Sequence, residues 1–258
     1  MIPEAPGPKP AKPAALKKGP APRKEDYLEN IGNSLDGDLR EKVKCGLSPS
    51  YNEYRQGLEK LNRSKPGDEV IFGRYLASHD GRPQPISWQV LAREGKRLLV
   101  ISKYGIDCRQ YNKELVGVTW EQCSLRKWLN KQFLHTAFNV HEQHIIPRVS
   151  LSADKNPSYN TDPGRATEDQ IFLLSIPEVN RYFKSDKDRK CRPTKYAVER
   201  GCYVDSTNKT CWWDLRSPGS SPLNVAFVYT DGAVDGRGGG VDGARGAVRP
   251  ALWINLDS

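Results

Sequence analysis

Residues able to bind a ligand gather toward the C-terminal end of the chain. The segment CWWDLRSPG (211–219) joins an aromatic pair to a carboxylate and a guanidinium group, and a segment rich in Gly and Asp follows it. Aromatic faces can stack on a sugar or a peptide, while charged groups give direction through hydrogen bonds. We therefore predict a ligand-binding set here, made of Trp212, Asp214, Arg216, Tyr229, Asp231, Asp235 and Arg237.

Two arginines of this region have two interpretations. Arg216 and Arg249 each lie among apolar residues, so each needs carboxylate or carbonyl partners. Asp214, Asp231 or Glu121 could supply the carboxylate, in which case the pairing fixes the loop. Alternatively, the arginines hold an anionic ligand.

The aromatic residues also have two interpretations. Alternation along a strand sends Trp212 and Trp213 to opposite faces, so at most one of them faces a ligand while the other packs inside. Tyr229 and Trp253 could complete a stacking platform or belong to the core. For any one of these rings, core packing is the commoner role.

Sequence patterns for catalysis and for cofactors are missing. The stretch GRGGG (236–240) lacks the Lys-Ser/Thr of a phosphate-binding loop, and HTAFNVHEQH (135–144) does not match HExxH. The spacing of Asp231, Asp235 and Asp242 does not match a calcium loop of the EF-hand type. We therefore predict no catalytic residue, no metal and no cofactor.

Six cysteines leave a second possibility open, although no CxxC pair indicates a zinc knuckle. In an exported protein Cys202 and Cys211 are close enough in sequence to bridge across a short loop. In the cytoplasm, buried reduced thiols are the expected state. A cysteine-dependent enzyme would instead need one thiol with a lowered pKa. The six are Cys45, Cys108, Cys123, Cys191, Cys202 and Cys211.

Composition and charge set outer limits for the 258 residues. The net charge is +9, and residues 1–24 form a Pro/Ala/Lys segment with six basic residues and one acidic residue. Such a segment predicts a disordered tether, and nucleic-acid attachment through it is a further, less favoured hypothesis. No membrane span and no signal peptide are recognisable, so we expect the cytoplasm by default, or the cell exterior if the chain is part of a longer protein. Nothing in the sequence predicts the oligomeric state.

The pattern of apolar residues predicts an α+β fold, because strands do not alternate with long helices. Strands are expected at 69–76, 87–94 and 96–104, with a hairpin at Gly95, and at 211–217, 224–234 and 248–256. The principal helix is expected from Thr119 to Phe138, with Thr119 and Gln122 forming a capping box. Its apolar face carries Trp120, Leu125, Trp128, Leu129 and Phe133. The predicted organisation is a tether (1–24), a short helical linker (25–66) and one domain (67–258).

Several segments, in this order, resemble a bacterial family of unknown function: IFGRY, PISWQVL, LLVISKYGIDCRQYN, TWEQCSLRKWLNKQF, DQIFLLS, TKYAVERG, WWDLRSPG and VRPALWINL. That family is similar to C-type-lectin-like and formylglycine-generating-enzyme-like folds. The resemblance implies mixed or antiparallel sheets, one principal helix, long irregular loops, paired first and last strands, and a ligand surface on loops near the C-terminus. Asp214 stands where the family pattern leads us to expect a further aromatic residue.

The leading hypothesis is therefore a non-catalytic binding module that presents Asp214, Tyr229 and the 230–247 loop to a protein or a glycan. Function in such a module lies on loops held by a rigid scaffold. The alternative is a cysteine-dependent oxidoreductase or sulfatase-modifying type of enzyme. That alternative is implied only by the resemblance, and Cys202 and Cys211 lie upstream of the last strands, away from the C-terminal cysteine pair of those enzymes.

Overall fold

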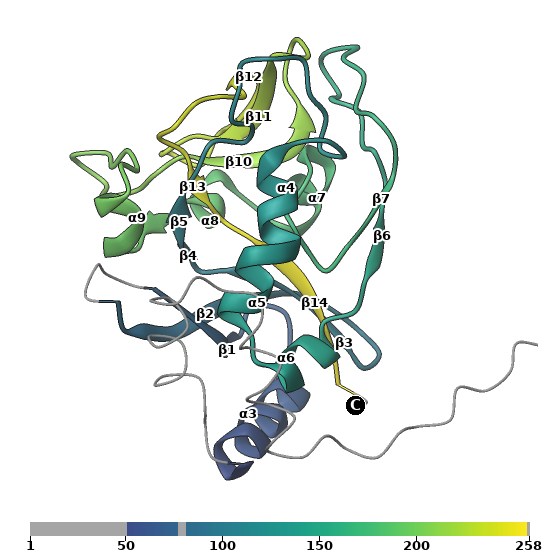
Figure 1. The fold of residues 1–258 in the computed structure, drawn as a ribbon, viewed down its shortest axis with the longest axis vertical. Coiled ribbons are helices and arrows are strands. Elements are labelled where there is room, and N and C mark those ends of the chain that lie inside the picture. The colour runs from purple at the N-terminus through teal and green to yellow at the C-terminus, as the bar shows by residue number, and fades with distance from the viewer. Residues whose placement is uncertain (1–50, 77–80, 257–258) are drawn as a thin grey trace, which may run out of the picture. The chain divides into compact units, whose positions relative to one another are not determined.

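A computed structural model of the chain describes residues 51–76 and 81–256 (Figure 1). The tether and most of the helical linker lie outside these residues. The end of the linker is helix α3 (Tyr51–Arg63), as the spacing of its apolar residues predicts. Leu61 of this helix is buried against the domain. No helix within the described ranges is long and apolar enough to cross a lipid bilayer.

The first sheet has five strands that are all paired antiparallel. Its hairpin turns at Gly95, which has the positive φ of +58° that the tight turn requires. In spatial order its strands are β1 (Glu69–Leu76), β2 (Pro83–Glu94), β3 (Arg97–Ser102), β14 (Ala251–Asn255) and β8 (Ile171–Phe172).

One prediction about this sheet is wrong: the first and last strands share the sheet but do not pair. Strand β14 pairs with β3 and with β8, while β1 pairs only with β2 among the described strands. The reason is the short hairpin at Gly95, which puts β2 and β3 next to each other and leaves the free edge of β3 for the C-terminal strand.

The second sheet carries the signature segments. It is antiparallel except for the pairing of β10 with β13, which is parallel. The stretch predicted as one strand over 224–234 is in fact a hairpin, because Gly232 (φ +92°) turns the chain and the glycine-rich segment returns as a strand of its own. In order the strands are β12 (Val234–Gly240), β11 (Asn224–Val228), β10 (Trp213–Pro218), β13 (Ala247–Val248) and β5 (Asp107–Cys108).

The principal helix is shorter than predicted. It begins at Ser124, because Cys123 accepts the capping hydrogen bond from the Arg126 N–H, and the predicted capping box at Thr119 and Gln122 does not form. One π-helical turn interrupts it, so it runs as α4 (Ser124–Trp128), a π-helix (Leu129–Phe133) and α5 (Leu134–Ala137). The apolar face is buried as predicted, from Trp120 to Phe133.

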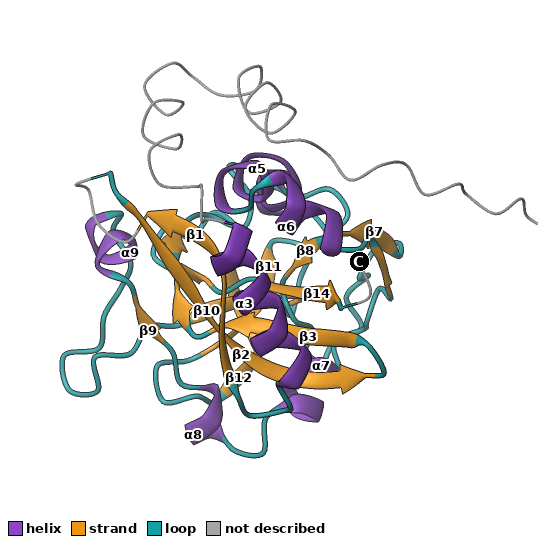
Figure 2. Ribbon diagram, turned by 90° about the horizontal axis from the view of Figure 1, so that it is seen from below, coloured by secondary structure: helices purple, strands orange, loops and turns teal. Residues whose placement is uncertain are grey.

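Short elements complete the domain, and Figure 2 shows them around the strands. Helix α7 is capped by Ser175 and helix α9 by Thr194, whose side chains accept backbone N–H groups of the first turn. These elements are α6 (Val140–Ile145), α7 (Ile176–Tyr182), α8 (Asp186–Arg189), α9 (Lys195–Glu199), β4 (Tyr104–Gly105), β6 (Val149–Leu151), β7 (Thr167–Asp169) and β9 (Arg192–Pro193).

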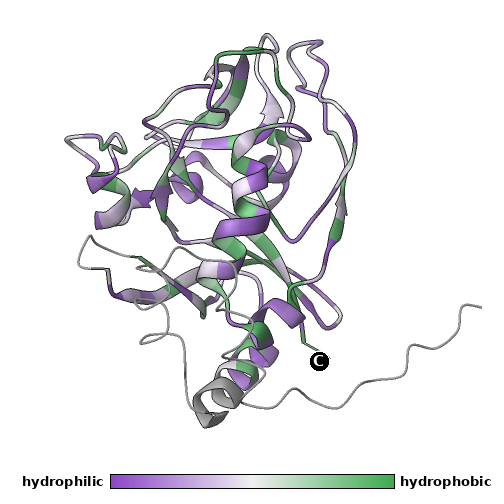
Figure 3. Cartoon of the chain, in the orientation of Figure 1, coloured by the Kyte–Doolittle hydropathy of each residue, from purple (hydrophilic) through white to green (hydrophobic). Residues whose placement is uncertain are grey.

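The core lies between the helix and the two sheets. Hydrophobic residues line β3, β14 and the inner side of the helix (Figure 3), and Trp88 and Trp213 are fully buried. The helix approaches β1 closely at Gly73, where an added Cβ would come within 2.5 Å of the Phe138 ring. The fold is thus α+β, with mostly antiparallel sheets and few helices.

Candidate functional site

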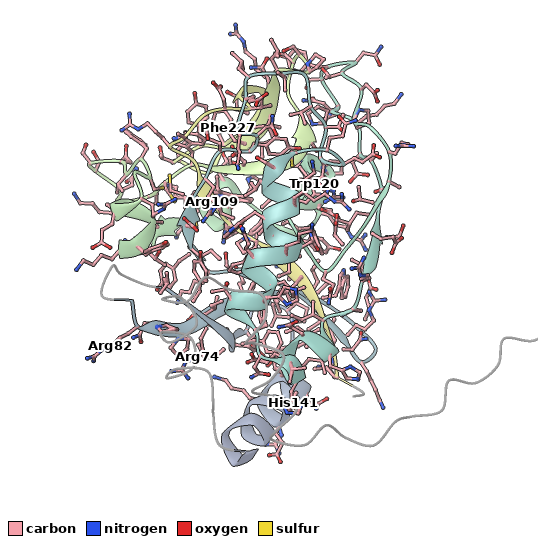
Figure 4. All side chains as sticks on the ribbon, in the orientation of Figure 1. Arg74, Arg82, Arg109, Trp120, His141 and Phe227 are labelled. Atoms are coloured by element: carbon pink, nitrogen blue, oxygen red, sulfur yellow. The ribbon has the colours of Figure 1, made fainter. Side chains whose placement is uncertain are left out.

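Three aromatic rings form a row on the second sheet. Trp212, just before β10, packs on Phe227 of β11 with ring centroids 5.3 Å apart, and Phe227 packs on Tyr229 at 4.8 Å. Phe227, labelled in Figure 4, is mostly covered by its neighbours, whereas Tyr229 is 47% exposed and Trp212 is half-buried. We call Trp212, Phe227 and Tyr229 the aromatic row. Trp213 is buried, as alternation predicts.

Glycines border the aromatic row where other residues would cover it. Gly239 of β12 lies against the Phe227 ring, since a Cβ there would be 3.6 Å from it. Gly243 and Gly246 lie against the Trp212 ring, and a Cβ at Gly246 would be only 2.5 Å from that ring. The glycine-rich sequence therefore lets the backbone pack closely against the Phe227 and Trp212 rings.

The polar residues predicted for the ligand set divide between the surface and the interior. Asp231 and Asp235 lie in the β11–β12 hairpin, where their Oδ1 atoms accept backbone N–H groups of Ala233 and Arg237. Arg237 is exposed on the same hairpin. These residues therefore share the hairpin with Phe227 and Tyr229.

Arg216 and Asp214 point inward. Arg216 is buried and pairs with Asp154 (3.0 Å) and Glu178, and it also donates to the Leu173 carbonyl (3.2 Å). Its partners are thus none of the carboxylates expected from the sequence, because the strand turns it toward α7. Asp214 is also buried, and burial, with the charge of nearby Cys202, raises the pKa of its carboxyl to about 8. Such a carboxyl keeps its proton at neutral pH.

Arg249 has a structural role as well. It is buried, donates to the carbonyls of Ser102 and Arg189 at 3.0 Å each, and lies over the Trp213 ring at 4.8 Å. These contacts tie the start of β14 to the second sheet, so Arg249 serves the packing of the domain interior.

Four cysteines from different parts of the sequence meet beside the aromatic row. Their thiols interact in series, Cys108 with Cys202, Cys202 with Cys211 and Cys211 with Cys191, and we call these four residues the thiol chain. The backbone explains the meeting. Cys211 pairs with Cys191 across an antiparallel bridge, and Cys108 pairs with Ala247, whose N–H bonds to Trp212, the residue after Cys211. All four thiols are reduced and buried.

The hydrogen bonds set the charge of the thiol chain. Bonds from Cys108 and Cys211 lower the pKa of Cys202 to about 4, with help from the charge of Arg245 and against the effect of burial. The pKa of Cys108 rises because of its bond to Cys202 and its burial, and the pKa of Cys211 rises because it bonds to both Cys191 and Cys202. Burial acts to raise the pKa of Cys191, but its bond with Cys211 and the charge of Arg249 leave it lowered. The lowered pKa favours the thiolate form of Cys202, and thiolates are the nucleophilic form of cysteine.

A buried carboxylate anchors the outer end of the thiol chain. Asp107, next to Cys108, accepts hydrogen bonds from Tyr75 (2.8 Å), from Arg109 (3.0 Å) and from the Cys108 N–H (2.7 Å). Arg109, labelled in Figure 4, also lies over the Trp128 ring at 4.1 Å, which ties this end to the principal helix. Among the described residues, no group of three or more His, Cys, Asp or Glu side chains is placed to hold a metal ion.

The sequence pointed to only half of this cluster. Cys202 and Cys211 are close in sequence and were candidates, whereas Cys108 is far from them, and neither Cys108 nor Cys191 belongs to a spacing signature. Phe227 was also missed, since it was not among the aromatic residues that the sequence singled out. The fifth described cysteine, Cys123, caps α4 and stands apart from the chain.

One segment borders both features. In residues 240–246, Gly243 and Gly246 lie against Trp212, while the Ala244 carbonyl accepts a hydrogen bond from the Cys108 thiol at 3.2 Å. Arg245 of the same segment bonds through its carbonyl to the Tyr203 N–H, next to Cys202. The aromatic row and the thiol chain therefore both contact the same segment, residues 240–246.

Residues 95–256 match the model of a family described as a domain of unknown function (DUF6273), which covers more than half of the chain. The chain therefore belongs to this family. Comparison with curated proteins and with solved structures found no match.

Proposed function

We propose that this domain is a non-catalytic module that binds a glycan on the aromatic row. The observation that carries the proposal is the row itself: a half-exposed Tyr229 and a half-buried Trp212 supported by Phe227 and bordered by glycines. Exposed aromatic rings with their faces free are suited to stack on the apolar face of a sugar ring.

A sugar site also needs directional hydrogen bonds, and the polar groups of the β11–β12 hairpin can provide them. Asp235 uses its Oδ1 for the backbone N–H groups of Arg237 and Gly238, and no described residue donates to its Oδ2. Arg237 adds exposed donors on the same hairpin. Asp214 and Arg216, predicted from the sequence as ligand residues, support the strand from inside and are left out of the proposed surface.

A glycan fits this surface better than a protein partner does. Protein interfaces of standard size cover about 800 Å² on each partner and have an apolar centre. Here glycines lie against the Phe227 and Trp212 rings, and the hairpin that carries Phe227 and Tyr229 also carries the polar side chains of Asp231, Asp235 and Arg237. A C-type-lectin-like scaffold, the finer fold that we propose, would carry its ligand on loops of this kind.

A glycan array probed with the full-length protein tests the proposal, followed by calorimetric titration of the best glycan. We expect Tyr229→Ala to weaken the affinity at least tenfold, which is about 1.4 kcal/mol, while the unfolding midpoint stays nearly unchanged. Alanine changes at Asp231 and Asp235 should weaken binding in the same way.

The matched control is Tyr104→Ala, since Tyr104 is also a partly exposed tyrosine (37%) but lies on β4, outside the row. Its affinity for the glycan should equal that of the unchanged protein. An array without signal, or binding that survives Tyr229→Ala, contradicts the proposal. Binding of a purified protein partner through Tyr229, with no glycan binding, also contradicts it.

A further inference from the structure

The thiol chain has an outer pair and an inner pair. Cys108 and Cys202 are 4% and 6% exposed, and Cys202 lies between the exposed residues Gly201 and Tyr203. Cys191 and Cys211 are 1% and 0% exposed. A small molecule at the surface can therefore reach the outer pair first, and the inner pair only through it.

The backbone brings the inner pair within bonding range. Cys191 and Cys211 are direct partners in an antiparallel bridge, with the Cys211 N–H bonded to the Cys191 carbonyl at 2.8 Å. Directly opposed residues have Cα atoms about 4.5–5.5 Å apart, inside the range that a disulfide spans. Cys202 bonds to Cys108 on one side and to Cys211 on the other, so it connects the two pairs.

We propose that the thiol chain is a buried disulfide relay, in which a low-molecular-weight disulfide oxidises the outer pair and thiol–disulfide exchange then moves the bond to the inner pair. This inference does not depend on the proposed glycan site. It assigns a chemical role to Cys108 and Cys191, which the sequence alone did not connect with any function.

The first stage is a net two-electron oxidation of the protein. The Cys202 thiolate attacks one sulfur of the small disulfide RSSR, the S–S bond breaks, and RS⁻ leaves and takes up a proton. Cys108, as its thiolate, then attacks the Cys202 sulfur, and the second RS⁻ leaves with the proton that Cys108 gave up. Two protein thiols are oxidised to one disulfide, and RSSR is reduced to two RSH.

The second stage moves the bond without further oxidation. Cys211 attacks the Cys202 sulfur and displaces Cys108, which takes the proton that Cys211 released. Cys191 next attacks the Cys211 sulfur and displaces Cys202 as the thiolate, and the proton of Cys191 goes to solvent. The product is a Cys191–Cys211 disulfide with Cys108 and Cys202 reduced again.

The deeper burial of Cys191 and Cys211 favours transfer of the disulfide from the outer pair to the inner pair. Reduction of a disulfide requires a thiolate to reach one of its sulfurs, and solvent does not reach the inner pair. The outer pair, by contrast, keeps some exposed surface, 4% at Cys108 and 6% at Cys202, and its thiols donate to the carbonyls of Ala244 and Tyr203. Oxidation that enters from outside is thus stored where external thiols react slowly.

A time course with oxidised glutathione tests the relay on the full-length, reduced protein. Samples are quenched in acid, free thiols are alkylated, and disulfides are mapped by mass spectrometry. We expect glutathione on Cys202 first, then a Cys108–Cys202 disulfide, and last a Cys191–Cys211 disulfide. A Cys191–Cys211 disulfide that forms before any modification of Cys202 overturns the proposal.

Cys202→Ser is the decisive variant, and Cys123→Ser is its control, because a serine hydroxyl in that position can still accept the capping hydrogen bond of α4. We expect Cys202→Ser to slow the oxidation of the inner pair at least tenfold and Cys123→Ser to leave it unchanged. Equal rates in Cys202→Ser and the unchanged protein overturn the relay.

Thermal unfolding of each variant shows whether the fold is kept. Should Cys202→Ser fail to fold, the order of products in the unchanged protein decides the matter. Random pairing that includes Cys123 at the rate of the other cysteines also overturns the proposal.

Discussion

The aromatic row and the thiol chain begin at neighbouring residues and yet are opposite environments. Cys211 is fully buried, Trp212 is half-buried, and Trp213 is fully buried again. One step along an extended strand turns a side chain from the interior to the surface. The surroundings of the two groups differ. Glycines lie against the Phe227 and Trp212 rings, whereas the four cysteines are buried in the interior. At the start of β10, the side of the strand that a residue faces therefore determines whether its side chain is buried or accessible to a ligand.

The largest loss of stability is expected on removing the buried charge of Arg216. Replacing Arg216 by Met leaves Asp154 and Glu178 without their buried partner, and we expect a loss of about 3 kcal/mol of unfolding free energy. Urea unfolding measures it. The control is Arg237→Met on the exposed hairpin, which should change stability by less than about 0.5 kcal/mol. Similar losses in both variants would remove the distinction between interior and surface.

Asp214 should make the unfolding free energy of the domain depend on pH. Its carboxyl has a pKa of about 8 in the folded protein because of burial and the charge of Cys202, and about 3.9 in the unfolded chain. The folded state thus holds a proton that the unfolded state releases, so this contribution to stability is complete below pH ~4 and is lost as pH rises through about 8. Between pH 6 and pH 8 we expect the protein to lose about 2 kcal/mol relative to Asp214→Asn.

Urea unfolding at several pH values measures this difference. The other groups near Asp214 are Tyr111, Cys202 and Arg216, and all remain in the variant. Glu142, whose pKa burial raises to about 7, shifts stability in the same direction but equally in both proteins. Asp231→Asn, on the exposed hairpin, is the surface control and should keep the pH dependence of the unchanged protein. Parallel curves for Asp214→Asn and the unchanged protein would contradict the buried carboxyl.

The last effect concerns the glycines that lie against the aromatic row. In Gly246→Ala the new Cβ would come within 2.5 Å of the Trp212 ring, and moving that ring should cost about 1–3 kcal/mol. Gly57→Ala in α3 is the matched control: no atom lies within 4 Å of its added Cβ, and alanine should stabilise the helix by up to about 1 kcal/mol. Urea unfolding should thus give opposite signs, and a shared sign would contradict the close packing at Trp212.

The sequence predicted the parts of the fold that depend on local periodicity. The hairpin at Gly95, the α+β class and the buried face of the principal helix are confirmed, since each follows from alternation or helical spacing over a few residues. The start of that helix was misplaced because a thiol at Cys123 took the capping role expected of Thr119. Strand pairing at the C-terminus was wrong because it is decided by contacts between distant segments.

The candidate site shows the same division. Tyr229 and the hairpin carboxylates could be singled out from residue type and turn chemistry, and the structure places them together. Arg216 could be recognised as needing a carboxylate, but its partners come from a loop and a helix far away in sequence. The meeting of Cys108 and Cys191 with the other thiols has no sequence signal at all, because it arises from the pairing of β5 with β13 and from the Cys191–Cys211 bridge.

Residues 240–246 touch Trp212 on one side and the Cys108 thiol on the other through Ala244. A ligand on the row and a disulfide in the chain would therefore both act on the position of the same short segment. Thermodynamic linkage requires such an effect to be mutual: by whatever factor oxidation changes the affinity for the ligand, the ligand must change the oxidation equilibrium by the same factor.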